Sequence, residues 1–386
     1  MGLLTIKFVN AWFSHGSDRR TGRTQAARQR SPTKQGYAAS LIALFLTCFA
    51  AHADTLRVAT WHVELTRKGP GLLLRDIQKD DDQVSVVVQI IDHIAPDVIL
   101  LTGLDWDPQG ITLDALNQKF ATAFPHVHYG TPNTGIPTQL DLDGDGYLGG
   151  AGDAQGWGRF RGHGSMALLS NIPIENVQDF TSMLWKDQPN ALLPEADGAL
   201  FPSADVYDIQ RLPSVAHWDI ALKNGLHLLA FTANPPVFDG PEDRNGRRNH
   251  DEISFWARHL TQLEKPAIVL GNANLDPKDG EGLHAAIRSL IDHPQLQDPK
   301  PASPGGAEAA ALQAGKNLKH TGDPALDTAD WSDEKGPGNL RVSYVLPGRA
   351  LDVHAAGVFW PRTDDPQSEL LVDGPRHRLV WVDVIR

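Results

Sequence analysis

Short apolar runs alternate with stretches of helical periodicity along the chain from residue 54 onward. Residues 56–60 and 97–101 are runs of the length expected for buried strands, and residues 82–93 between them repeat their apolar positions with helical spacing. Further strands are expected at residues 165–170, 217–222, 226–231, 267–270, 341–346 and 378–384. This mixture predicts an α/β fold in which two sheets pack against each other within one mature domain.

Turn and cap residues indicate how these elements are joined. The turn at residues 223–225 connects two of the expected strands. Asn249 is expected to cap a helix that runs to about residue 263, with acidic residues in its first turn. Residues 129–164 and 294–339 are rich in Gly, Pro, Asp and Ala, and both are expected to be long loops.

The first 53 residues differ in character from the rest of the chain. A basic stretch that ends at Lys34 is followed by the apolar run 38–51 and by a small-x-small site at 51–53. This order is typical of a secretory signal peptide, and the run is shorter than the roughly 20 residues of a transmembrane helix. We therefore expect 1–53 to be a signal peptide with a basic extension, and 54–386 to be a periplasmic or secreted domain without a membrane span.

The mature part of the chain is acidic and contains no cysteine. The full chain has a net charge of −12, and because residues 1–53 carry seven Lys or Arg and one acid, the remainder holds −18. Such a surface repels polyanions, so nucleic acid is not an expected partner. The only cysteine, Cys48, lies in the expected signal peptide, which leaves the mature domain without a disulfide. Nothing in the sequence indicates an oligomer, and we expect a monomer.

Polar residues follow the expected strands, at the position where ligands bind in α/β proteins. These strand ends read TWHV at 60–63, LTGLD at 101–105, GNANLDP at 271–277 and PRHRL at 375–379. In order, spacing and context they resemble the endonuclease/exonuclease/phosphatase superfamily, and segments 235–256 and 378–384 resemble a secreted bacterial branch of it. The resemblance implies a four-layer α/β (α+β) sandwich, with two packed mixed sheets flanked by helices, and divalent-metal-assisted hydrolysis of a phosphate ester.

The resemblance also implies which residues stand at the family's functional positions. The metal-binding glutamate falls on Gly103, the general-base aspartate on Asn272 and the asparagine after the first strand on His62, whereas Asn274 and His377 are kept. Three further positions are substituted: a histidine by Thr232, an aspartate by Ser343 and the aspartate before His377 by Arg376. Loss of a general base costs about 10²- to 10⁴-fold in rate. We therefore expect a weak or inactive member that binds a phosphate-containing small molecule.

A second interpretation is an active phosphatase or nuclease with rearranged metal ligands. Asp105 and Asp276 follow the expected strands, and either could join His62 and His377 in a metal site. Mixed nitrogen and oxygen ligands suit Zn²⁺ or Mn²⁺ better than Mg²⁺, which prefers oxygen ligands. Alternatively, the two aspartates are turn and cap residues hydrogen-bonded to the backbone.

An aspartate-rich segment leads to a third interpretation. Asp141, Asp143 and Asp145 occupy positions 1, 3 and 5 of a sequence that matches the opening of an EF-hand calcium loop. Position 12 is Gly152 instead of glutamate, so the closing ligand is displaced or absent. The segment 141–153 therefore predicts either a Ca²⁺ site, which would make the protein a calcium-stabilised interaction module, or a solvated acidic loop.

Arginines near the expected cleft are candidates for ligand binding. Arg244, Arg247 and Arg248 lie among four acids in segment 242–252. At the N-terminus of a helix they would bind a phosphate through bidentate hydrogen bonds. Because the acids nearly balance them, the same arginines could instead form internal ion pairs that support the cleft. Arg376 is the fourth candidate.

Overall fold

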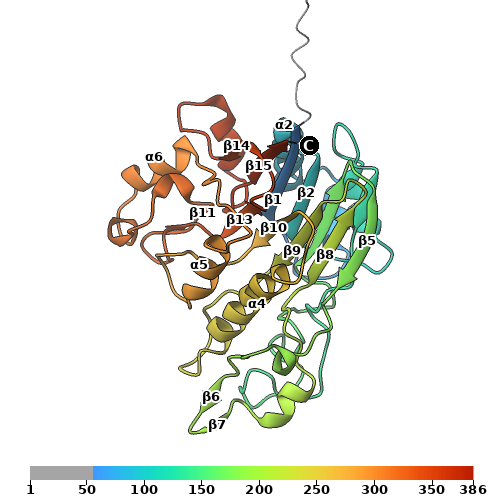
Figure 1. Ribbon diagram of the computed structural model, residues 1–386, viewed down its shortest axis with the longest axis vertical. Helices are drawn as coiled ribbons and strands as arrows, with labels where there is room; N and C mark the ends of the chain where they lie inside the picture. The colour runs from blue at the N-terminus through green and yellow to red at the C-terminus, as the bar shows by residue number, and fades with distance from the viewer. Residues whose placement is uncertain (1–54, 386) are drawn as a thin grey trace, which may run out of the picture. The chain divides into compact units, whose positions relative to one another are not determined.

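Two mixed β-sheets form the centre of the structure, a computed structural model that describes residues 55–385 (Figure 1). The expected signal peptide, its basic extension and Cys48 lie outside the described residues. The first sheet has six strands in the order β14-β15-β1-β2-β4-β3, of which β1 and β2 run parallel. Their bounds are β1 (Thr55–Leu65), β2 (Val98–Leu104), β3 (His126–His128), β4 (Ser165–Ser170), β14 (Val353–Val358) and β15 (Val380–Ile385).

The second sheet has five strands in the order β13-β10-β9-β8-β5, of which β9 and β10 run parallel. Their bounds are β5 (Ile174–Asp179), β8 (His217–Leu222), β9 (His227–Thr232), β10 (Ala267–Asn272) and β13 (Ser343–Pro347). Two short strand pairs complete the set: β6 (Glu195–Ala196) with β7 (Ala199–Leu200), and β11 (Ala329–Asp330) with β12 (Asn339–Leu340). The antiparallel pair β8 and β9 is joined by the turn expected at residues 223–225.

Helices α1 (Leu72–Gln78), α2 (Asp82–Ile94), α3 (Ile111–Asn117), α4 (Arg244–Leu260) and α5 (Ala285–Ile291) lie on the outer faces of the two sheets. The remaining α-helix of the described residues, α6 (Pro304–Leu312), packs against a short 3-10 helix. Short 3-10 helices occur at η1 (Trp185–Asp187), η2 (Ala204–Asp208), η3 (Asn317–Lys319), η4 (Pro324–Leu326) and η5 (Pro366–Leu371). None of these described helices has the length and apolar character needed to cross a membrane.

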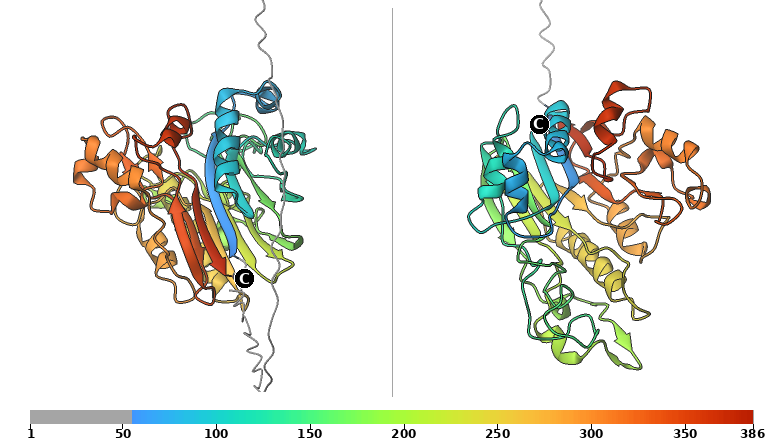
Figure 2. Two further views of the ribbon diagram at one scale, coloured as in Figure 1. Left: turned by 90° about the horizontal axis from the view of Figure 1, so that it is seen from above. Right: turned by 180° about the vertical axis from the view of Figure 1, so that it is seen from behind.

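Three apolar clusters hold the layers together. Leu56 and Val58 of β1 pack against Trp218 and Ile220 of β8 between the two sheets. The opposite face of the first sheet packs against α1, α2 and α3, drawn in blue and cyan in Figure 2, and the outer face of the second sheet packs against α4 and α5. Because successive side chains of a strand point to opposite faces, β1 serves two of these clusters at once. The predicted four-layer sandwich is confirmed.

Two local expectations are corrected. Helix α4 begins at Arg244, after Asp243 in the left-handed conformation, and not at Asn249. Asn249 lies inside the helix, fully buried, where its side-chain amide donates hydrogen bonds to the carbonyl oxygens of Asn234 and Ala273. The expected loop 294–339 contains α6, whose start carries cap signals that the sequence prediction missed: a serine that accepts a hydrogen bond from the backbone and a proline at the first helical position. Residues 129–164 hold no helix or named strand, as expected.

Candidate functional site

The strand ends open into a cleft with two adjoining lobes. The larger lobe has a volume of about 1180 Å³ and the smaller one about 630 Å³. His62, Asn274 and residues of the segment 235–238 line both lobes, so the two lobes share an inner wall. The side chain of Phe238 in this segment is 92% exposed. A ligand that enters one lobe therefore contacts residues that also line the other.

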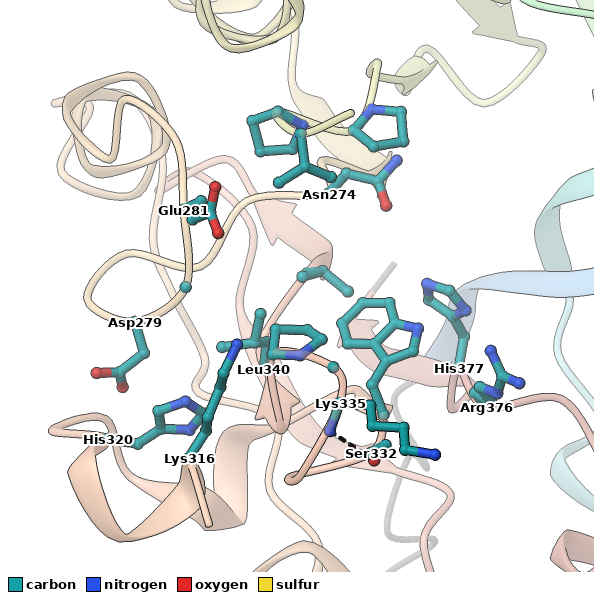
Figure 3. Close-up of a pocket in the computed structure, with 18 of the residues that line it drawn as sticks. Asn274, Asp279, Glu281, Lys316, His320, Ser332, Lys335, Leu340, Arg376 and His377 are labelled. Carbon is teal, nitrogen blue, oxygen red and sulfur yellow. Dashed lines mark hydrogen bonds between the residues drawn. The ribbon is translucent and has the colours of Figure 1, made fainter. Parts of the chain in front are cut away.

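The larger lobe is basic, although the chain as a whole is acidic. It is lined by Lys278, Lys316, Lys319, Lys335 and Arg376, against the two acids Asp279 and Glu281. In Figure 3, Lys316, His320 and Asp279 lie on one side of the open centre, and His377 and Arg376 lie on the opposite side. A cleft lined mostly by one sign of charge raises the local concentration of ions of the opposite sign. This lobe therefore favours an anionic ligand.

His62 and His377 lie side by side at the wall of this lobe, with ring centroids 4.4 Å apart. Nδ1 of His377 lies 2.8 Å from Oε1 of Glu64, and the same oxygen accepts a hydrogen bond from the backbone N–H of Arg376 at 3.0 Å. Burial opposes ionisation of Glu64, but the hydrogen bond and charge of His377 outweigh it and lower the pKa of this carboxyl. His377 therefore has a carboxylate partner that comes from β1.

Sequence reasoning missed Glu64. It lies two residues after His62, so strand alternation places the two side chains on the same face. The prediction ended the first strand at residue 60, whereas β1 continues to Leu65 through a shift in its pairing with β2. Glu64 itself has φ 51. The alternation from His62 is the signal that could have found this residue.

The His62 ring occupies the space next to Gly103. A Cβ at Gly103 would lie 2.6 Å from Cε1 and 2.8 Å from Nε2 of His62, and the backbone there has φ +74. The ring is held in place by its Nδ1, which lies 3.0 Å from Oγ1 of Thr102. Burial, with a contribution from the charge of His377, lowers the pKa of His62 to about 3, so its ring is neutral at pH 7. No side chain fits at residue 103 while His62 stays where it is.

Asn272 places a neutral amide where the family pattern implies a carboxylate, and it lies beside the retained Asn274. Asn272 ends β10 and is buried, and its side-chain Nδ2 lies 3.1 Å from Oδ1 of Asn274 and 3.4 Å from Nδ1 of His62. The Nδ2 group of Asn274 donates to the carbonyl oxygen of Ala233 at 2.8 Å. Thr232 and Ser343 pair with Asn272 across the neighbouring strands. The structure therefore brings the sequence-predicted positions His62, Asn272, Asn274 and His377 to one site.

The two aspartates proposed as metal ligands are engaged by the backbone. Asp105 accepts hydrogen bonds from the N–H groups of Arg67 and Gly164 at 2.8 and 3.2 Å. Its burial raises its pKa to about 6. Asp276 accepts three backbone N–H bonds at 2.7 to 2.8 Å. Neither carboxylate lines either lobe, so these contacts favour the turn-and-cap interpretation over metal binding with His62 and His377.

The residues of the cleft do not fit the metal centre of the family pattern. A hard divalent cation takes oxygen ligands and is usually held by at least one carboxylate, but residue 103 has no side chain and residue 272 is an amide. The nearest carboxylate to the histidines, Glu64, already binds His377 through Oε1. We derive no reaction step through a metal at this site.

Asp141, Asp143 and Asp145 do lie close together. One oxygen of each falls within 4.8 Å of the others, and among residues 55–385 no other trio of acidic or histidine side chains is so arranged. Asp153, which follows the twelfth loop position, is buried and accepts hydrogen bonds from backbone N–H groups within the loop. The loop could therefore hold a metal ion through its opening half, but its closing ligand is missing.

The three arginines in the first two turns of α4 have different environments. Arg248 is buried and its guanidinium donates to four backbone carbonyl oxygens, those of Gln155, Arg211, Leu212 and Pro213. Arg247 lines neither lobe, whereas Arg244 and Arg248 both line the smaller one. Among residues 55–385, no ion pair joins any of these arginines to an acid. The supporting role expected for the cluster holds for Arg248, but its partners are carbonyl groups and not carboxylates.

The chain is similar to one family of known proteins. A family model described as "Endonuclease/Exonuclease/phosphatase family" matches residues 66–372. Similar solved structures include an endonuclease/exonuclease/phosphatase from Beutenbergia cavernae, with 16% identity, 86% of this chain and 71% of that chain covered, and a TM-score of 0.47. A 3' phosphatase from Neisseria bound to a product DNA hairpin has 15% identity, with 85% of this chain and 99% of that chain covered and a TM-score of 0.47. Sphingomyelinase C from Streptomyces griseocarneus has 12% identity, with 86% of this chain and 99% of that chain covered and a TM-score of 0.45. No curated protein matches the chain.

Proposed function

Because the chain belongs to the endonuclease/exonuclease/phosphatase family, we propose that it is an exported binding member whose hydrolytic activity is weak or lost. The family is typically dependent on a divalent metal. The ligand is a phosphate-containing small molecule that binds in the larger lobe of the cleft. The observation that carries this proposal is the His62 ring packed against Gly103, in the place of the family's metal-binding glutamate.

Two features support the loss of hydrolysis. A metal would need a carboxylate at residue 103, where a Cβ would meet the His62 ring. A general base would need a group at residue 272 that accepts a proton at neutral pH, and an amide does not. Metal and base act together in such sites, so loss of both removes the ordinary mechanism and not merely one step.

Binding is supported by the charge and size of the larger lobe. Five Lys or Arg side chains face two acids there, and the volume of about 1180 Å³ is ample for a small organic phosphate. Export is supported by the sequence of residues 1–53, with its basic stretch, apolar run and small-residue site. An extracytoplasmic ligand follows from these two proposals together.

The test combines binding with turnover. Calorimetric titration with small organic phosphates is expected to show binding that Arg376→Gln and Lys316→Gln weaken. Hydrolysis of a generic phosphodiester with Mg²⁺, Mn²⁺ or Zn²⁺ is expected to stay near the uncatalysed background. The proposal fails if no phosphate compound binds, or if the wild type shows robust turnover that His377→Ala abolishes.

A second candidate function rests on the Glu64–His377 contact. A carboxylate that holds one ring nitrogen of a histidine is the usual arrangement for a general acid or base, and Nε2 of His377 is buried without a partner next to His62. This pair favours a phosphatase or nuclease with rearranged ligands. Glu64→Gln distinguishes the two functions. It would abolish the turnover of an active enzyme, whereas a protein that only binds its ligand would show no turnover before or after the substitution.

A further inference from the structure

Arg244 is a buried cation without a partner. Its side chain is 8% exposed, and its Nε is buried with no hydrogen-bond partner. No hydrogen bond or ion pair from this guanidinium is found among residues 55–385. Arg248, one turn further along α4, is also buried but donates to four carbonyl oxygens. Two neighbouring buried arginines therefore differ in one respect: only Arg248 is satisfied by the protein itself.

An unpaired buried charge is costly, because the charged group loses water without gaining an acceptor. Burial accordingly lowers the pKa of Arg244, although nearby carboxylates oppose this shift. Asp143 and Glu242 are among these carboxylates, but none lies within ion-pair distance of the guanidinium. An arginine stays protonated in proteins. The guanidinium is therefore a buried cation that nearby carboxylates stabilise only from a distance, without a direct contact.

Arg244 can be reached by a ligand, because it lines the smaller lobe of about 630 Å³. This lobe adjoins the larger one, since His62 and Asn274 line both. The first turn of α4 does not compete for the same ligand with its amides, since the backbone N–H of Asn245 already donates to Asp239. Of the two arginines that line this lobe, only Arg244 lacks a protein partner, and the carboxylate of Asp143 lines the lobe as well.

We propose that Arg244 is the centre of a second anion subsite, and that the ligand is a small organic molecule with two phosphate groups. One phosphate binds in the basic larger lobe, and the other binds to Arg244 in the smaller lobe, with the linking part of the molecule beside segment 235–238. A guanidinium binds a phosphate through two parallel hydrogen bonds. This inference rests on the proposed function, since it adds a second group to the same ligand.

The test is a calorimetric comparison of alkyl monophosphates with α,ω-alkanediol bisphosphates of increasing chain length. The best bisphosphate is expected to bind the wild type roughly 10- to 100-fold more tightly than its monophosphate, the gain of charge-assisted hydrogen bonds to one added group. Arg244→Gln is expected to remove this gain and to leave monophosphate affinity unchanged. Arg247→Gln is the matched control, because Arg247 lies on the same helix and lines neither lobe.

The outcomes separate this inference from the proposed function. Equal affinity for both compound classes at every chain length overturns the second subsite alone. Absence of binding by either class overturns the proposed function and the subsite with it. An equal loss of both affinities in Arg244→Gln also overturns the subsite. If Arg244→Gln fails to fold, Arg244→Lys provides the test. Lysine keeps the positive charge but cannot donate two parallel hydrogen bonds to one phosphate, so part of the affinity difference between bisphosphate and monophosphate is expected to be lost.

Discussion

The packing of His62 beside Gly103 makes a quantitative prediction for Gly103→Ala. A Cβ there would lie 2.6 Å from Cε1 of the ring, and the backbone has φ +74. The left-handed conformation costs about 1–2 kcal/mol for a residue with a Cβ, and overpacking a filled site adds about 1–3 kcal/mol. We therefore expect Gly103→Ala to lower the free energy of unfolding by about 2–5 kcal/mol.

Gly110 provides a matched control for the backbone term. It has φ +72, close to that of Gly103, but a Cβ added there would meet nothing within 4 Å. Gly110→Ala is therefore expected to cost only the conformational part, about 1–2 kcal/mol. The difference between the two variants isolates the steric conflict with the His62 ring.

The assay is urea denaturation of the wild type, Gly103→Ala, His62→Ala and the double variant. If the ring is the obstacle, Gly103→Ala should lower the free energy of unfolding less in the His62→Ala background than in the wild type. The difference, the coupling energy, is expected to be about 1–3 kcal/mol. The reasoning is refuted if Gly103→Ala costs no more than Gly110→Ala, or if the coupling energy is near zero. Either result would mean that His62 does not block the family's metal-ligand position.

Three further predictions concern calcium, pH and export. Saturating Ca²⁺ is expected to raise the melting temperature, because a hundredfold excess over Kd stabilises the folded state by about 2.7 kcal/mol. The triple Asp→Asn variant at 141, 143 and 145 should lose this response. A melting temperature that neither Ca²⁺ nor a chelator changes would leave only the solvated loop. Burial and the nearby charge of Asp276 raise the pKa of Asp327 to about 8, so the folded state binds this proton more tightly and stability falls as pH rises from about 4 to 8. Asp327→Asn should therefore stabilise at pH 8 and change little at pH 4, and equal denaturation curves at pH 8 would contradict this assignment. Protein recovered from its host is expected to begin near residue 54, and an intact N-terminus in the cytoplasm would exclude export.

Most of the fold could be predicted, because the strands have both faces covered and read as short apolar runs. The runs at 217–222 and 165–170 coincide with β8 and β4. The start of α4 could not be found in the same way. Its first turns bury polar side chains, among them Arg248 and Glu252, which are stabilised by hydrogen bonds to distant backbone groups. The spacing of apolar residues does not predict such long-range hydrogen bonds.

The candidate site was predictable in its positions but not in its contacts. Strand ends placed His62, Asn272 and His377 together, since ligands gather where strands end. The partner of His377 was not predictable, because Glu64 reaches it from a strand that continues past its expected end. The free guanidinium of Arg244 was equally hidden, because the sequence shows four acids nearby and only the structure shows that none pairs with it.

The substitutions in the cleft share one electrostatic consequence. Relative to the family pattern, Gly103, Asn272 and Ser343 each replace a carboxylate with a neutral group, and His62 adds no charge because its pKa is about 3. In a metal-dependent site such carboxylates are compensated by the bound cation. Without the cation, carboxylates at these three positions would repel a phosphate. This chain has no carboxylate at any of the three, and lysines line the larger lobe. The proposed loss of metal-assisted hydrolysis and the proposed binding of a phosphate without a metal would therefore follow from the same substitutions.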